Sequence, residues 1–311
     1  MSHVNAVQQE NRSMVALCEG GVRARVWKGG AGVILVLWAV CFAPKLQAQR
    51  QFNESKEIGM AVGTGYYLGD INPYRHFGGR LHASAGGFFR YNITPRISVR
   101  ANVVRGTVEA WDADSDDSWQ VNRNLHFRNR ITEYGALVEL NYLDHRLGNP
   151  EDRIGAYLFT GLAVYAHMPE AEIDGTWYAL QPLGTEGQGT TWGEARGLRP
   201  YTTAGMSLPI GFGFKVNVGP AIAFNVEWGV RKTWNDYLDD VSTTYADVRV
   251  LRAEKGDLAA TFAERLIALP DGREQVAGLQ RGDPGKDDAY GFVTASLCFR
   301  VSKKPTTCAY R

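Results

Sequence analysis

The sequence predicts an all-β protein, an eight-stranded antiparallel transmembrane (outer-membrane) β-barrel with long external loops. Two observations indicate this fold. Apolar positions alternate with polar or small ones in most of eight segments, and the connections between the segments are short and long in turn. Composition agrees, because 35 glycines, 8 tryptophans and 14 tyrosines suit strands better than helices. The formal net charge of +1 gives no global indication of nucleic-acid binding.

The first segment, Glu57–Leu68, reads EIGMAVGTGYYL. Alternate positions from Ile58 to Leu68 are mostly apolar, and the positions between them are mostly glycine or alanine. Alternation of this kind marks a strand with two unlike faces. A closed barrel in a membrane explains the combination, because the apolar row would face lipid while the glycines leave room in a narrow interior.

Seven further segments complete the predicted barrel. In most of them one row is aliphatic or aromatic, and the other contains Ser, Asn, Gly, Arg or Glu. One segment, Ile154–His167, is apolar on both faces. The eight predicted strands are Glu57–Leu68, Arg80–Asn92, Ile97–Thr107, Arg130–Tyr142, Ile154–His167, Tyr201–Asn217, Ala221–Arg231 and Tyr290–Val301.

The connections between the predicted strands alternate in length. Short ones such as NITPR (92–96) and NVGP (217–220) lie between longer ones, the longest of which separates the last two strands. Outer-membrane barrels have short periplasmic turns and long external loops in this order. An even number of strands places both termini on the periplasmic side. The sheet must close, because an open edge would leave backbone groups unpaired in hydrocarbon.

An eight-stranded barrel encloses side chains and not a pore. The predicted inward rows carry both signs of charge, so we expect a buried ionic network inside. Its expected members are Arg80, Arg90, Arg100, Glu133, Glu139 and Glu227. The alternative is a water-soluble, lipocalin-like barrel, which would turn the apolar rows inward and leave these charged side chains exposed.

Residues 1–48 are expected to be a signal peptide and residues 49–311 the outer-membrane β-barrel domain. Three basic residues precede the apolar run 31–43, and the small residue Ala48 suits cleavage. The apolar run is shorter than the roughly 18 residues that a membrane-spanning helix needs. An uncleaved signal anchor is the alternative, and Met14 is a second candidate start.

Few segments have the residues that chemistry requires. Asp112–Asp117 begins like a calcium loop, but Asp117 stands where such loops need glycine, and Arg123 where they need a bidentate glutamate. His82 and Ser84 lie two apart on one strand, a spacing that a lipid hydrolase could use for base and nucleophile, without an evident third residue. We therefore expect no enzymatic activity, no metal site and no cofactor.

Three other features concern structure. After cleavage Cys298 and Cys308 remain, and whether they pair is left open. The Arg-Gly-Asp triplet that begins at Arg281 indicates a binding motif only if it forms an exposed turn. Residues Glu254–Pro270 predict one helix, with its apolar face packed over the external mouth of the barrel.

Several stretches resemble the PorG-like family of outer-membrane barrels. LQPLGTEGQG and YLDDVSTTY are the most specific, because barrel alternation produces neither. Asp112–Asp117 and Thr190–Arg199 have no counterpart in the family pattern. The resemblance spans residues 55–301 and is carried by YYLGDINP (66–73), RYNITPRISVRAN (90–102), LQPLGTEGQG (180–189), EWGVRKTWNDYLDDVSTTY (227–245) and RGDPGKDDAYGFVTASLCF (281–299).

The resemblance implies a structural component of type IX protein secretion that contacts periplasmic ring subunits of the PorK and PorN type. Partner-binding residues would then lie on the periplasmic side, in the longest turn, Leu143–Arg153, and in the tail, Ser302–Arg311. The expected ones are Asp144, Arg146, Glu151, Asp152, Lys303 and Lys304. The alternative is a stand-alone surface barrel, adhesin-like or lipid-modifying. Outer-membrane lipid is the other expected partner, with no nucleic acid and no small-molecule substrate.

Overall fold

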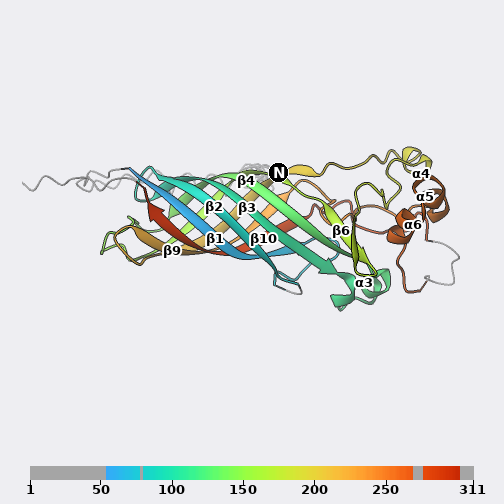
Figure 1. The fold of residues 1–311 in the computed structure, drawn as a ribbon, viewed down its shortest axis with the longest axis horizontal. Coiled ribbons are helices and arrows are strands. Elements are labelled where there is room, and N and C mark those ends of the chain that lie inside the picture. The colour runs from blue at the N-terminus through green and yellow to red at the C-terminus, as the bar shows by residue number, and fades with distance from the viewer. Residues whose placement is uncertain (1–53, 78–79, 269–275, 302–311) are drawn as a thin grey trace, which may run out of the picture. The chain divides into compact units, whose positions relative to one another are not determined.

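A computed structural model of the chain describes residues 54–77, 80–268 and 276–301, and eight of its strands form a closed antiparallel barrel (Figure 1). Around the barrel the order is β3-β2-β1-β10-β9-β8-β5-β4, and β4 pairs with β3 to close the sheet. All eight predicted strands are therefore confirmed. Their bounds are β1 Ser55–Leu68, β2 His82–Asn92, β3 Ile97–Trp111, β4 His126–Asn141, β5 Ile154–Ala166, β8 Ala204–Asn217, β9 Ile222–Thr233 and β10 Ala289–Arg300.

The two ends of the barrel differ. One end, here called the short-turn end, has the turns 93–96, 142–153 and 218–221, together with the start of β1 and the finish of β10. The other end, the loop end, has the segments 69–81, 112–125, 167–203 and 234–288. The predicted signal peptide, residues 1–48, lies outside the described residues, as do Lys303, Lys304 and Cys308.

The loop end has strands that the sequence reading missed. β6 (Pro169–Ile173) and β7 (Thr176–Ala179) form a hairpin that continues the sheet from β4 (Figure 1). Asp174 and Gly175, both with positive φ, make its two-residue turn. Asp-Gly between two short strands is a recognised hairpin signal, and the flanking strands are only five and four residues long, too short for clear alternation.

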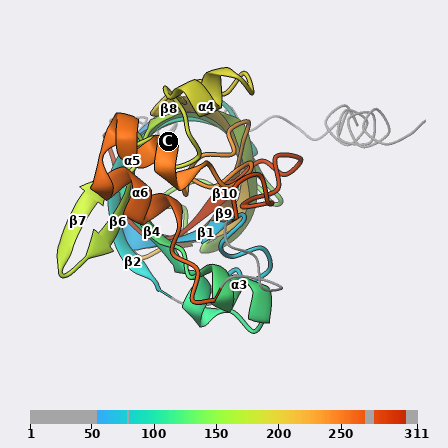
Figure 2. The same ribbon diagram turned by 90° about the vertical axis from the view of Figure 1, so that its right-hand side faces the viewer.

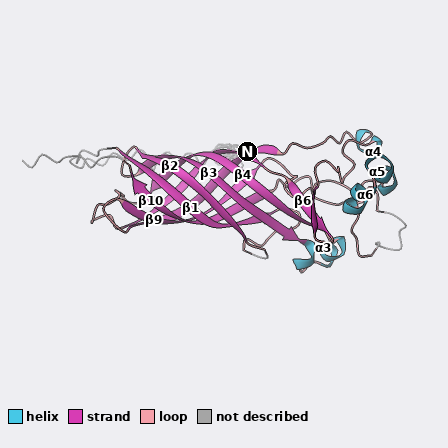
Figure 3. Ribbon diagram, viewed as in Figure 1, coloured by secondary structure: helices cyan, strands magenta, loops and turns pink. Residues whose placement is uncertain are grey.

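Short helices also gather at the loop end, where Figure 3 shows them in cyan. They are η1 Asp112–Asp114, α3 Ser118–Arg123, α4 Thr191–Glu194, α5 Val248–Lys255 and α6 Asp257–Ala263. The prediction of one helix over Glu254–Pro270 is wrong, because Gly256 adopts a φ of 94° and separates α5 from α6. Among the described helices, none combines the length and the apolar character that a membrane span requires.

The helices α5 and α6 lie over the open mouth of the barrel when it is viewed along its axis (Figure 2). Phe262 of α6 is 2% exposed and belongs to the same core as Tyr67, Phe127 and Tyr290 from the barrel strands. The expected apolar contact with the barrel mouth is thus present, although the helix that makes it is shorter than predicted.

The predicted faces of the strands are also confirmed. Ile58, Met60 and Val62 of β1 are 48%, 66% and 64% exposed, so the apolar row points outward. The inward glycines leave space for rings, since a Cβ on Gly59 would lie 2.2 Å from the Phe88 ring. The outward apolar rows contradict the lipocalin-like alternative, which requires them to point inward.

The interior is filled by a buried ionic network with Glu139 at its centre. Its carboxylate lies 2.9 Å from Arg90 Nε, 3.1 Å from Arg100 Nη1 and 2.7 Å from Lys215 Nζ. All four side chains are at most 3% exposed. One carboxylate is therefore shared by three cations from three different strands.

Two more carboxylates complete the balance of charge. Glu57 lies 2.9 Å from Arg90 Nη1, and Glu227 pairs with Arg100 and accepts a hydrogen bond from Tyr157. Three carboxylates thus face three cations, so the cluster carries no net charge. This neutrality matters because an unpaired buried charge would be strongly destabilising.

A second pair lies nearer the loop end. Glu133 Oε2 is 3.1 Å from Arg231 Nε and 2.8 Å from the hydroxyl of Tyr290, which donates to it. The prediction of a buried network is correct for Arg90, Arg100, Glu133, Glu139 and Glu227, and it missed Glu57, Lys215 and Arg231.

For Arg80 the prediction is wrong. β2 begins only at His82, so Arg80 belongs to the preceding loop, where its side chain is 45% exposed. It lies 3.2 Å from Asp114 and 3.6 Å from Glu109, outside the barrel network. The strand-end residue was assigned to the barrel by alternation alone, and alternation does not mark where hydrogen bonding to the neighbouring strand starts.

We expect Glu139→Gln to destabilise the barrel by about 3–5 kcal/mol, because three buried cations would then face only two carboxylates. The measurement is the temperature at which the folded barrel converts to the slower-migrating, unfolded form on detergent gels. Asp144→Asn is the control: its pair with Arg96 is about half exposed, so a change below about 1 kcal/mol is expected. Equal losses in the two variants would contradict the central role of Glu139.

Candidate functional site

The longest turn of the short-turn end folds into the barrel opening. Leu147, at 2% exposure, packs with Phe88, Ala223 and Cys298 inside the barrel. Gly148 has a φ of 76°, and a Cβ there would lie 2.0 Å from the carbonyl oxygen of Pro220 on the neighbouring turn. The turn therefore closes this end of the barrel with a fixed conformation.

Two of the predicted partner-binding residues hold that conformation. Arg146 Nε lies 2.7 Å from Asp152 Oδ2, and Asn149 Nδ2 donates to the same oxygen at 2.9 Å. Asn217 Nδ2, from the end of β8, donates to the carbonyl oxygens of Arg146 and Asp152 at 3.0 and 2.7 Å. The side chains of Arg146 and Asp152 are 31% and 10% exposed, so Asp152 presents little surface.

The other two predicted residues of the turn are exposed. Asp144 Oδ1 lies 2.7 Å from Arg96 Nε, which belongs to the turn 93–96, and Glu151 lies beside Asp152. The structure thus brings Asp144, Glu151 and Arg96 to one exposed polar surface. The ion pair across two turns could not be found from the sequence, because it depends on the pairing of β3 with β4.

At the loop end, Glu186 connects loops that are far apart in the chain. This carboxylate is 0% exposed and accepts from Ser242 N at 2.9 Å, Thr243 Oγ1 at 2.7 Å and Arg281 Nη1 at 3.0 Å. Arg281, from the Arg-Gly-Asp triplet, is 2% exposed. The triplet is therefore part of the loop core and not an exposed recognition turn.

Asp240 extends the same cluster. Its carboxylate accepts hydrogen bonds from Thr185 at 2.5 Å and from the Tyr201 hydroxyl at 2.6 Å. Burial raises the pKa of Asp240 to about 6, against the opposing effect of Arg281. The loops 167–203 and 234–288 are consequently joined by buried polar contacts into one ordered cap over the barrel.

A more acidic group lies where this cap meets the barrel. The Tyr67 hydroxyl is 2.6 Å from Asp239 Oδ2 and 2.5 Å from Asp288 Oδ1. A phenol has one proton to donate, so one of these carboxyl groups must itself carry a proton for both contacts to be hydrogen bonds. Burial raises the pKa of both aspartates, in agreement with that requirement.

Asp236 stands beside this group without a compensating contact. Within the described residues, neither of its buried carboxylate oxygens has a hydrogen-bond partner. Burial raises the pKa of Asp236 to about 8, with further increases from Asp70, Glu186 and Asp287, against a hydrogen bond from Ser242. The protonated form is therefore favoured in the folded cap.

The Asp112–Asp117 segment forms structure instead of a calcium loop. Asp112 pairs with Arg123 through two contacts of 2.6 and 2.7 Å, and Asp117 accepts from Trp119 N at 2.9 Å as the cap of α3. In the part of the chain that the structure describes, no three His, Cys, Asp or Glu side chains are grouped to hold a metal ion.

His82 and Ser84 are likewise not joined as base and nucleophile. His82 Nε2 lies 2.8 Å from Glu109 Oε2, so a third residue does orient the imidazole, which the sequence reading did not identify. Ser84 is 4% exposed inside the barrel, and among the described residues its hydroxyl has no hydrogen-bond partner. The two side chains therefore do not form a catalytic pair in this arrangement.

Comparison with protein families gave a match of residues 33–176 to a family described as a domain of unknown function (DUF6089). The matched segment includes β1 to β6. The comparison with curated proteins gave no match.

Three solved structures illustrate the structural comparison. Neisserial surface protein A has 8% identity and a TM-score of 0.39, with 80% of this chain and 99% of that chain covered. Ail of Yersinia pestis, in complex with the heparin analogue sucrose octasulfate, has 8% identity, a TM-score of 0.37 and coverage of 80% and 99%. OprG of Pseudomonas aeruginosa has 8% identity, a TM-score of 0.36 and coverage of 82% and 100%. All three scores are below 0.5, so the barrel is defined here by its own strand pairing.

We expect Asp236→Asn to stabilise the cap at alkaline pH. The pKa of Asp236 is raised in the folded state, so its contribution to stability is fully present below the unfolded value near pH 4 and is lost as pH rises through about 8. Asparagine cannot ionise, so the variant should resist proteolysis of the segment 234–288 better than the wild type at pH 9 and no better at pH 4.

Asp174→Asn, at the exposed hairpin turn, provides the control and should leave the pH profile of proteolysis unchanged. The same pH profile in the wild type and in Asp236→Asn would show that Asp236 does not control the opening of the cap.

Proposed function

We propose that this chain is an outer-membrane β-barrel that acts as a structural component of type IX protein secretion and anchors a periplasmic ring to the membrane. The observation that carries the membrane part of the proposal is the exposed apolar belt around a closed barrel. The secretion role adds the resemblance to the PorG-like family and the chemistry of the short-turn end.

The belt is continuous around the barrel. Large apolar side chains point outward from every barrel strand, where soluble proteins rarely expose contiguous apolar surface beyond a few hundred Å². On β5 and β8 alone, the exposed ones are Ile154, Leu158, Leu162, Val164, Met206, Ile210, Phe212 and Phe214. Lipid is the surrounding that makes such a surface favourable, and a closed barrel has no unpaired edge there.

The short-turn end suits a ring partner better than a small ligand. Both described chain ends lie there, and its exposed surface includes the polar group of Asp144, Glu151 and Arg96. Exposed charges of this kind give salt-sensitive contacts in which each pair contributes little, so several must act together. If the short-turn end is periplasmic, both termini are periplasmic as well, and PorK- and PorN-type subunits would meet this surface.

A stand-alone surface barrel is the second candidate, favoured by a cleft at the loop end. The cleft has a volume of about 900 Å³ and lies between segments 68–75, 109–123 and 280–289. Tyr74 and Trp119, which are 84% and 47% exposed, line it. Exposed aromatic rings beside charged loops suit an adhesive surface. In both candidates the role is binding and not enzymatic.

We expect the mature chain to fractionate with the outer membrane and to migrate faster on unheated gels, as closed barrels do. Val226→Arg, which places a charge on the outward face, should impair assembly by roughly 2–4 kcal/mol at mid-membrane. As the matched position, a cysteine replacing Asn225, which is 0% exposed, should resist a lipid-soluble thiol reagent, whereas one replacing Val226 should react. Recovery in the soluble periplasm would reject the membrane proposal.

The ring-anchoring role predicts that Asp144→Lys combined with Glu151→Lys releases the periplasmic partners in a pull-down from solubilised membranes. These two residues are exposed, and the Arg146–Asp152 pair that fixes the turn stays intact, so the barrel should remain heat-modifiable. Glu194→Lys with Asp257→Lys, at the loop end, makes the same change in charge and should retain the partners. Normal secretion and normal partner recovery in the first variant would favour the surface-barrel alternative.

A further inference from the structure

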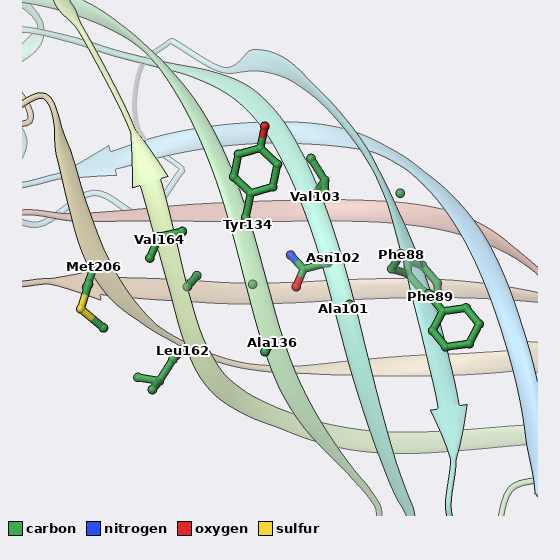
Figure 4. A pocket seen from close by; sticks show the side chains of 13 residues that line it. Phe88, Phe89, Ala101, Asn102, Val103, Tyr134, Ala136, Leu162, Val164 and Met206 are labelled. Atoms are coloured by element: carbon green, nitrogen blue, oxygen red, sulfur yellow. The ribbon is translucent and has the colours of Figure 1, made fainter.

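The outer face of the barrel has a hollow across β2, β3, β4 and β5 (Figure 4). Its volume is about 670 Å³, within the range of about 300–1,000 Å³ that small-molecule sites occupy. Ala101 and Ala136 form its floor, and the larger side chains of Phe89, Tyr134 and Leu162 stand around it.

The strand register explains the hollow. Ala101 pairs directly with Ala136 across β3 and β4, while Phe89 and Leu162 occupy the next positions outward in the same row, on β2 and β5. Two adjacent alanines thus lie between two large side chains. The result is a groove within the apolar belt, at a point where the neighbouring rows are filled by aromatic and branched residues.

Basic residues stand beside this groove, on its loop-end side. Arg105 follows Ala101 by four residues on the same outward row of β3, which is about 13 Å along the strand. Arg130 of β4 is its diagonal neighbour, because Arg105 pairs with Thr132 and Thr107 pairs with Arg130. Two outward guanidinium groups therefore mark the edge of the apolar belt above the hollow.

These two arginines are available to a ligand. Arg105 is exposed and, among the described residues, has no hydrogen bond or ion pair. The Arg130 side chain is 53% exposed, and its contact is with Glu170 at 3.3 Å, a carboxylate that Arg128 also approaches at 2.8 Å. One carboxylate shared by two arginines leaves positive charge on this edge.

We propose that the hollow, Arg105 and Arg130 form a binding site for a phosphorylated, acylated lipid of the outer leaflet. An acyl chain would lie over Ala101 and Ala136, and a phosphate would accept hydrogen bonds from the two guanidinium groups, which suit phosphate geometry. The arrangement matches the ligand in both parts, an apolar groove for the chain and cationic donors toward the membrane surface for the headgroup. This inference rests on the proposed outer-membrane location.

The headgroup part is tested with the purified full-length mature barrel in detergent, by native mass spectrometry with diphosphoryl lipid A and with its dephosphorylated form. The wild type should bind the phosphorylated lipid more tightly, and Arg105→Gln with Arg130→Gln should weaken that binding by about tenfold or more. Lys232→Gln, an exposed basic residue near the loop end of β9, is the matched control and should bind as the wild type does.

The chain part is tested with Ala136→Leu, which fills the floor of the groove with an outward side chain. This variant should weaken binding of the phosphorylated lipid, whereas Ala295→Leu, at an outward position of β10, should not. Equal binding of the two lipid forms by the wild type would overturn the proposal, and so would equal losses in the test and control variants.

The outcome is separable from that of the proposed membrane location. All variants are first examined for outer-membrane fractionation and heat-modifiable migration. A barrel that inserts correctly but shows no preference for the phosphorylated lipid refutes the lipid site alone. A wild type that does not fractionate with the outer membrane refutes the location on which the site depends.

Discussion

The barrel depends on the sharing of Glu139 among Arg90, Arg100 and Lys215. Strands with apolar outer faces must place their polar side chains inside, and eight strands enclose too little space for water to solvate many charges. Charges of opposite sign from different strands therefore have to meet, with Glu57 and Glu227 completing the balance. The same contacts require each strand to lie in one register, because a shift by one residue would turn a charge outward.

The cap at the loop end uses buried polar contacts with a different balance. Glu186 and Arg281 are paired, but Asp236, Asp239 and Asp288 are not neutralised by cations of their own. Protons replace the missing cations, so the cap is the part of the molecule whose stability responds to pH. The barrel below it is neutral by pairing and has no such need.

Alternation in the sequence was sufficient to predict the eight barrel strands, their faces and most members of the ionic network. It could not place the ends of the strands, and for this reason Arg80 was wrongly assigned to the interior. The break at Gly256 was missed because helical periodicity continues across it, and the β6–β7 hairpin because its strands are short. Of the expected partner-binding residues, the sequence could not separate exposed Asp144 and Glu151 from Arg146 and Asp152, which hold the turn together.

The pairing of β1 with β10 has a consequence for the order of events during folding. These strands are the first and last of the barrel, yet they are hydrogen-bonded from Glu57–Arg300 to Leu68–Ala289. No shorter portion of the chain can form this seam, so the cylinder stays open until the final strand has been delivered. Contacts between such distant segments form slowly, because a large loop must be ordered first. The export route must therefore keep the incomplete sheet from aggregating for as long as that last strand is missing.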